Sequence, residues 1–183
     1  MDTRLVLAIL LLVSAVALSG GVEQALRPVE AGFALFPGGP MGGALSAVLL
    51  SGPMGASPEL SWSAGAERVA GYALIAENVD LQGDGAVFWA IWNIPADARR
   101  IPAGIPRLPV LARGVRQART VDGDFGYQPP SLTQARQHRL RFTLVALEEL
   151  LHLDDSIGAD QAASAIYAAS RATTTWRIGG AWR

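Results

Sequence analysis

The sequence contains no cysteine, which excludes disulfides, thiol nucleophiles and thiolate metal sites. Lysine is also absent, so all 15 basic residues are arginine, a side chain suited to planar, two-point contacts with anions. Only 17% of the residues are charged and the formal net charge is −1. This balance gives no electrostatic attraction to nucleic acid or to an anionic membrane. We therefore expect no nucleic-acid partner.

Histidine is scarce as well, since the chain has only His138 and His152. Two histidines without cysteine are too few for a histidine-rich zinc site. The run DLQGDG at residues 80–85 begins like a calcium loop, but its twelfth position is Ile91, where a bidentate glutamate belongs. A serine-hydrolase G-x-S-x-G elbow does not occur. We expect no metal, no cofactor and no catalytic residues.

The N-terminus has the layout of a secretory signal peptide. One arginine precedes an unbroken apolar run, Leu5–Val13, and small residues follow, with plausible cleavage points after Ala17 or Ser19. The apolar run is shorter than the ~20 residues that span a bilayer. We predict a signal peptide over 1–19, a single domain over 20–183, and export to the periplasm or the medium. Retention of the segment as an uncleaved anchor is the alternative.

The rest of the chain has short apolar runs separated by stretches rich in glycine and proline, a pattern typical of a mainly β fold. The predicted strands are Leu45–Leu50, a short strand within 57–65, Tyr72–Ala76, Ala86–Ile94 and Arg139–Leu147. Alanine-rich helical spacing predicts one amphipathic helix over Ala159–Arg171. Residues 95–137 are expected to form a long loop region with one or two short strands.

The stretch Gly85–Asp97, GAVFWAIWNIPAD, departs from the alternation of a half-buried strand. Every residue from Val87 to Trp92 is apolar, although neighbouring side chains of a strand point to opposite faces. Either both faces of this strand are covered, or one of them lines an apolar pocket.

Six segments together resemble the phosphatidylethanolamine-binding protein (PEBP) family, and most closely its bacterial branch of Raf kinase inhibitor-like proteins. In chain order they are SPELSWSAG, GYALIAENVD, FWAIWNIPADARRIPAG, GYQPP, HRLRFTLVAL and GGAWR. The resemblance is clearest over 57–183. It implies a Greek-key β-sandwich with a C-terminal α-helix. It also implies a small pocket for phosphate-like anions such as phospholipid headgroups, placed at the start of the aromatic strand.

Carried over position by position, the family's pocket falls on residues that are distant in the sequence. The ligand-binding residues implied by the resemblance are Asn78, Asp80, Phe88, Trp89, Tyr127, Pro129, Pro130 and His138.

Three of the family's polar groups are replaced in this chain. Asn78 stands where the family has the first acid of an Asp-Pro-Asp motif, Phe88 where it has a histidine, and Leu140 where it has a tyrosine. His138 retains the family's second histidine. Because Phe88 removes a possible cation and adds an apolar wall, we expect a drier pocket that binds bare phosphate more weakly and accepts an apolar or amphipathic molecule.

The resemblance favours a non-catalytic binding or regulatory protein for a small anionic or amphipathic ligand. Two alternatives stay open: an enzyme in which His138 and Asp80 act as an acid–base pair, and a scaffold whose pocket has decayed. A protein partner or a homodimer is also compatible with the sequence. Export would make a cytosolic kinase an unsuitable target.

Overall fold

The structure is a computed structural model, and it describes residues 35–37, 56–63, 69–83, 86–128 and 137–181. The chain divides into two compact units, Met1–Gly32 and Phe33–Arg183. All of the described residues belong to the second unit.

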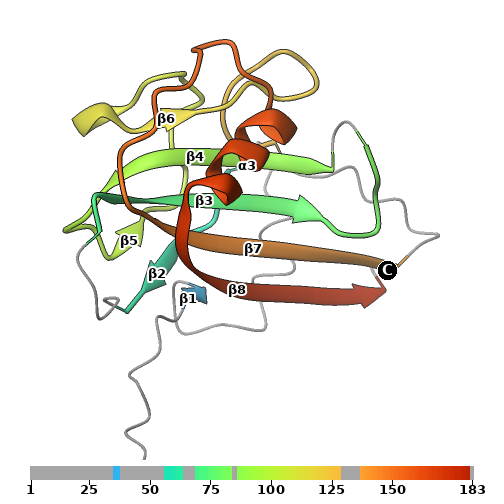
Figure 1. Ribbon diagram of the computed structural model, residues 1–183. Helices are drawn as coiled ribbons and strands as arrows, with labels where there is room; N and C mark the ends of the chain where they lie inside the picture. The colour runs from blue at the N-terminus through green and yellow to red at the C-terminus, as the bar shows by residue number, and fades with distance from the viewer. Residues whose placement is uncertain (1–34, 38–55, 64–68, 84–85, 129–136, 182–183) are drawn as a thin grey trace, which may run out of the picture. The chain divides into compact units, whose positions relative to one another are not determined.

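The described strands of this unit form two antiparallel sheets (Figure 1). The larger sheet contains, in spatial order, β6 (Arg116–Gln117), β4 (Val87–Pro95), β3 (Gly71–Asn78), β7 (Gln137–Leu147) and β8 (Ser170–Ala181). The smaller sheet contains β1 (Leu35–Pro37), β2 (Leu60–Trp62) and β5 (Arg100–Ile101). A helix, α3 (Ala159–Ala168), and a 3-10 turn, η1 (Ala112–Gly114), complete the described elements. The mainly β sandwich with a helix near the C-terminus is confirmed.

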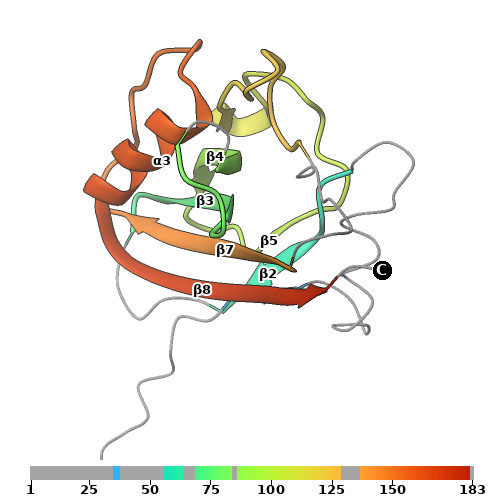
Figure 2. The ribbon, with the colours of Figure 1, turned by 90° about the vertical axis from the view of Figure 1, so that its right-hand side faces the viewer.

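One face of the larger sheet is covered by α3, which lies beside β3 and β4 in Figure 2. The helix contributes Ala162, Ala163 and Ile166 to an apolar cluster that includes Val145 of β7 and Trp92 of β4. Apolar side chains at i, i+1 and i+4 share one stripe of a helix, which is why this short alanine-rich segment can lie flat on the sheet.

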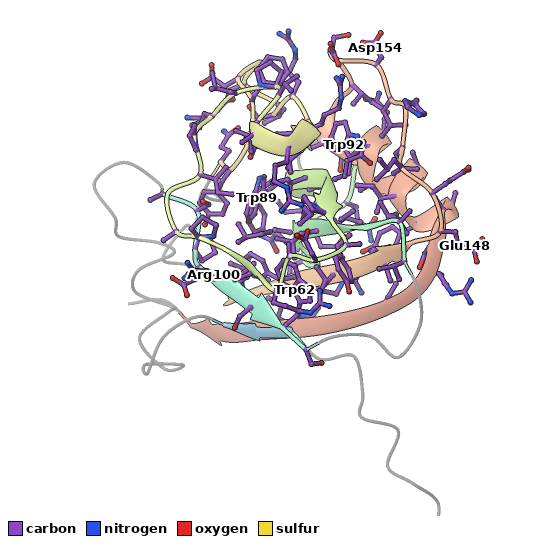
Figure 3. All side chains as sticks on the ribbon, turned by 90° about the vertical axis from the view of Figure 1, so that its left-hand side faces the viewer. Trp62, Trp89, Trp92, Arg100, Glu148 and Asp154 are labelled. Carbon is purple, nitrogen blue, oxygen red and sulfur yellow. The ribbon has the colours of Figure 1, made fainter. Side chains whose placement is uncertain are left out.

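The opposite face of the larger sheet carries the second apolar cluster, to which the smaller sheet contributes Leu60, Trp62 and Ile101. In Figure 3, Trp62 and Trp89 lie in this cluster, and Trp92 lies toward α3. Both faces of β4 are therefore covered. This explains why the aromatic strand has no polar face.

Two bulges interrupt the pairing of β4 with β3. Ala76 pairs with Trp89 and Glu77 with Val87, so that Phe88 is an extra residue in β4. The register shifts again between Tyr72 and Leu74, close to Asn93, which adopts a left-handed conformation with φ 57°.

The predicted strands that fall on described residues are confirmed in β2, β3, β4 and β7. The predicted strand Leu45–Leu50 lies outside the described residues. Within 95–137, short strands do occur, at β5 and β6.

The predicted helix is right at its start and too long at its end. It stops at Ala168, and Ser170 already belongs to β8, a strand that the sequence reading missed. The run Thr173–Thr175 favours a strand because β-branched side chains fit a pleated sheet better than a helix. Its eleven pairs with β7 then decide the conformation.

Among the described residues, α3 is too short to cross a bilayer, and no longer apolar helix occurs there.

Candidate ligand-binding site

The first bulge of β4 places Phe88 and Trp89 in the same apolar cluster, although they are neighbours in sequence. In a regular strand they would point to opposite faces. Both are buried, with 5% and 0% of their surface exposed. The bulge therefore produces a two-ring aromatic wall at the start of β4.

Tyr127 joins this wall from the segment that follows β6. Its ring meets Phe88 at a centroid distance of 5.9 Å and Trp89 at 5.5 Å, both edge to face. Such arrangements match the positive edge of one ring to the negative face of the other. The backbone N–H of Gln128 donates to the carbonyl of Phe88 at 3.1 Å and fixes this segment beside β4. Burial raises the pKa of Tyr127, so its hydroxyl stays protonated at physiological pH.

Gln117 of β6 is a buried polar residue that the sequence reading missed. Its Oε1 accepts from Nε1 of Trp89 at 2.9 Å, and its Nε2 donates to the carbonyls of Pro106 and Leu108 at 2.8 and 2.9 Å. Gly126 packs closely against it, since a Cβ at that position would lie 2.9 Å from Oε1 of Gln117. No local signal in the run RQAR distinguishes this glutamine from a surface residue.

Asn78 ends β3 on the face that carries Ala76 and the aromatic wall, and only 1% of it is exposed. Its Oδ1 accepts from the backbone N–H of Asp80 at 3.1 Å, which shapes the turn after the strand. Its own N–H donates to the carbonyl of Ala86 at 2.8 Å. The turn at 78–80 is therefore tied to the beginning of β4.

Asp80 binds the start of β7 through Arg139. One carboxylate oxygen accepts from the backbone N–H of Arg139 at 2.6 Å, and the other accepts from its Nε at 2.7 Å and its Nη2 at 2.6 Å. The hydrogen bond that Arg139 donates to Asp80 raises the pKa of Arg139. The negative charge of Asp80 is therefore matched by a guanidinium directly beside it.

His138 precedes Arg139 in β7 and pairs with Gly180 of β8. The backbone of His138 therefore lies next to Arg139, whose contact with Asp80 joins residues that are 59 positions apart in the sequence. The side chain of His138, and Pro129 and Pro130 entirely, lie outside the description. The structure brings together the backbone segments 78–80, 88–89, 127–128 and 138–139. The convergence of all the predicted side chains stays a prediction.

Among the residues that the structure describes, no group of three or more histidine, aspartate or glutamate side chains could hold a metal ion.

Comparison with known proteins places the chain in a family. The sequence model of the family described as phosphatidylethanolamine-binding protein matches residues 34–178. The chain belongs to this family. The match includes α3, the aromatic wall and both sheets, apart from the last three residues of β8.

Two curated relatives of the PEBP chain are UPF0098 proteins. The protein from Methanothermobacter thermautotrophicus is 32% identical over 98 residues, which cover 54% of this chain and 64% of the relative. UPF0098 protein YbhB of Escherichia coli is 31% identical over 102 residues, which cover 54% of this chain and 65% of YbhB. The chain thus spans slightly less than two thirds of the length of these relatives.

Two solved structures share the fold. Escherichia coli YbcL, described as a new member of the mammalian PEBP family, aligns with a TM-score of 0.63 at 22% identity, covering 84% of this chain and all of YbcL. A PEBP homolog from Chlamydia trachomatis aligns with a TM-score of 0.58 at 21% identity, covering 74% of this chain and 87% of the homolog. At these identities the alignments support the fold, and the function has to be argued from the site.

Proposed function

We propose that this PEBP-family protein is an exported, non-catalytic protein that binds a small phosphate-bearing or amphipathic anion at the aromatic wall. The observation that carries the proposal is the double clamp at this end of the larger sheet. Asp80 holds the 78–80 turn to Arg139, and Gln128 holds the segment containing Tyr127 to Phe88. Family membership over 34–178 supports a ligand at this place.

The clamp also determines the charge that a ligand would meet. Asp80 is matched by Arg139, Asn78 is neutral, and Phe88 adds an apolar wall. Under this proposal the variable charge is that of His138, because histidine is the side chain that titrates near neutral pH. An imidazolium attracts an anion and a neutral imidazole does not.

The test is a calorimetric titration of inorganic phosphate and of phosphoethanolamine at about pH 5.5 and pH 8, on either side of the usual histidine pKa. We expect tighter binding at the lower pH, loss of this pH dependence in His138→Ala, and stronger phosphate binding in Phe88→His. His152→Ala is the matched control, because His152 is exposed and outside the clamped segments. Equal, pH-independent affinities in all variants would contradict the proposal and favour the alternative of a scaffold whose pocket has decayed.

The acid–base alternative gains no support from the described contacts. The described partner of the Asp80 carboxylate is the guanidinium of Arg139, a group that does not exchange its proton near neutral pH.

Export rests on the apolar run at the N-terminus, which resembles a signal peptide. We expect the mature chain to begin near Leu18 or Gly20. Fractionation of the host followed by N-terminal sequencing checks this, and recovery of the chain from the cytosol with Met1 intact would contradict export.

A further inference from the structure

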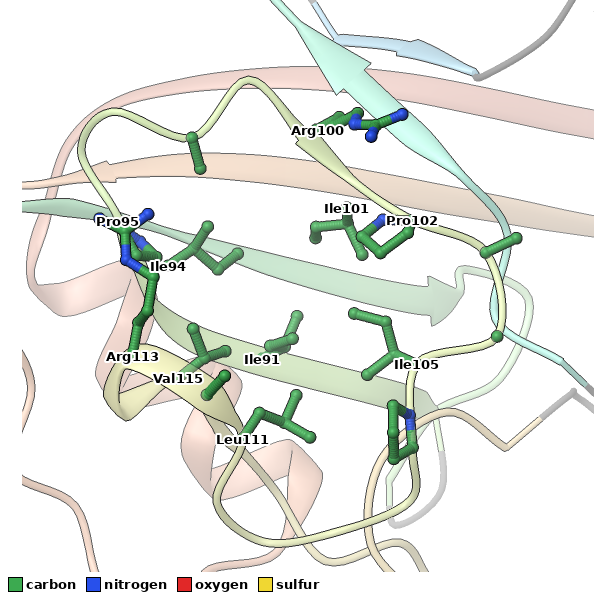
Figure 4. A pocket seen from close by; sticks show the side chains of 15 residues that line it. Ile91, Ile94, Pro95, Arg100, Ile101, Pro102, Ile105, Leu111, Arg113 and Val115 are labelled. Atoms are coloured by element: carbon green, nitrogen blue, oxygen red, sulfur yellow. The ribbon is translucent and has the colours of Figure 1, made fainter.

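A cavity lies toward the end of β4 that is remote from the aromatic wall, between that strand and the segment 95–115 (Figure 4). Its volume is about 370 Å³, within the range of small-molecule sites. Every described residue that lines it is apolar except Arg100 and Arg113. None of the predicted ligand-binding residues whose side chains the structure describes belongs to this lining.

The floor of the cavity is the hydrophobic core itself. Ile91 and Ile94 of β4 and Ile101 of β5 belong to the core cluster, and Ile105 and Leu111 pack against it while remaining partly exposed. Apolar surface left open to water is unfavourable, and its cost grows with the exposed area. A hollow of this composition is therefore suited to an apolar occupant.

The outer wall is held open by contacts that do not depend on a ligand. Ser57 accepts from Gly104 through its carbonyl and from Ile105 through its hydroxyl, both at 2.9 Å. Gln117 fixes the carbonyls of Pro106 and Leu108. Because the wall is anchored from both sides, the cavity is preformed. A ligand therefore binds without a large entropy cost for ordering the loop.

Arg113 lies at the mouth of this cavity in an uncommon backbone conformation. Its φ is 60° and its ψ is 23°, the left-handed region that non-glycine residues rarely adopt. The guanidinium donates to Asp97 at 2.8 Å, and the side chains remain 62% and 70% exposed. This hydrogen bond from Arg113 lowers the pKa of Asp97. Figure 4 shows the arginine extending along the edge of the cavity to Pro95.

We propose that this cavity is a second ligand site, which binds a single-chain amphiphile with a terminal anion, such as a medium-chain carboxylate. The alkyl chain packs on Ile91, Ile94 and Ile105, and the carboxylate replaces Asp97 as the partner of Arg113. The site lies apart from the proposed phosphate site, because no described residue of the aromatic wall lines the cavity.

Calorimetric titration with decanoate, below its micelle concentration, tests the proposal. We expect one site per chain and about tenfold weaker binding in Arg113→Gln, since a charge-assisted hydrogen bond is lost. Asp97→Asn should bind several-fold more tightly, because the competing carboxylate is gone. Arg107→Gln should bind like the wild type. It is the matched control, since Arg107 also forms one exposed ion pair, at 3.2 Å with Asp124, and lies outside the lining.

Two further ligands test the contribution of the alkyl chain separately from that of the charged head group. Neutral 1-decanol should bind the wild type and Arg113→Gln equally, and decyltrimethylammonium should bind the wild type more weakly than decanoate does. Leu111→Asp, checked for folding by circular dichroism, should abolish decanoate binding. In the unmodified protein, intermolecular NOEs from the decanoate methylenes to the methyls of Ile91, Ile94 and Ile105 locate the ligand without any substitution.

Absence of decanoate binding to the wild type, or NOEs to Phe88 and Tyr127 in place of the isoleucines, would overturn the proposal. Equal affinity in Arg113→Gln and the wild type would overturn the role of the anion. Failure of phosphate to bind in the earlier test leaves these outcomes unchanged, so the two proposals can fail separately.

Discussion

Gln117 is the residue at which three segments of the domain meet. It binds Trp89 of the aromatic wall, the carbonyl of Pro106, which lines the cavity, and the carbonyl of Leu108, and Gly126 packs closely against it. Only 1% of it is exposed. A buried amide that satisfies one donor and two acceptors leaves all of them unpaired when it is removed.

Gln117→Leu should therefore lower the free energy of unfolding by about 3 kcal/mol, since each buried group left without a partner costs roughly 1–3 kcal/mol. Urea denaturation measures the change. Gln82→Leu is the control, because Gln82 is exposed and a surface substitution stays within about 0.5 kcal/mol. Equal midpoints for the two variants would show that the Gln117 contacts contribute little.

For single residues, the sequence predicts which residue types belong to the site, but it does not predict which backbone groups they contact. The resemblance selects Phe88, Trp89 and Tyr127 as neighbours, and the structure places their rings in contact. The role of Gln117 cannot be predicted from the sequence, because it depends on carbonyls that a loop turns toward this side chain. A carbonyl is present at every residue, so no sequence pattern marks the ones that need a partner.

The described strand β4 contains two bulges and one residue with a positive φ. Its second bulge lies near Asn93, which has φ 57° and forms a two-point contact with Leu151. Asn93 Nδ2 donates to the carbonyl of Leu151 at 2.9 Å, and its Oδ1 accepts from the N–H at 2.8 Å. Asparagine tolerates the left-handed region better than most residues and can form both bonds at once.

Asn93→Ala should cost about 2–3 kcal/mol of stability, because it loses both hydrogen bonds and keeps an unfavourable φ. Asn93→Gly should cost less, since glycine adopts this φ freely and only the hydrogen bonds are lost. The difference between the two, measured by urea denaturation, isolates the backbone strain. A glycine variant no more stable than the alanine variant would mean that strain is absent.

The existence of β3, β4 and β7 can be predicted from their apolar runs, whereas their exact pairing cannot. Runs such as Tyr72–Ala76 indicate burial, which local sequence encodes. A bulge depends on which residue of the partner strand lies opposite, and β8 depends on the edge that β7 offers. Both are tertiary effects, and they override the helical spacing that extended the predicted helix to Arg171.

At the scale of the whole domain, the same three strands supply both apolar clusters. β3 contributes Leu74 to one cluster and Ile75 to the other, and β4 contributes Trp89 and Trp92 in the same way. Neither cluster can lose its strands while the other remains intact. The helix α3 packs on the cluster that contains Ile75 and Trp92, and its removal would expose Trp92 and Val145 of the central strands.

We therefore expect one cooperative unfolding transition for the domain. Of the tryptophans whose side chains the structure describes, Trp62 and Trp89 report by fluorescence on one cluster and Trp92 on the other. Far-ultraviolet circular dichroism reports on the sheets and α3. If the clusters are a single unit, the two signals give the same urea midpoint and slope. An earlier midpoint by circular dichroism would contradict this, because it would mean that α3 detaches while the aromatic core survives. Trp92→Phe makes the test stricter, since it removes the described tryptophan that shares a cluster with α3, and the fluorescence of this variant should still follow the circular dichroism.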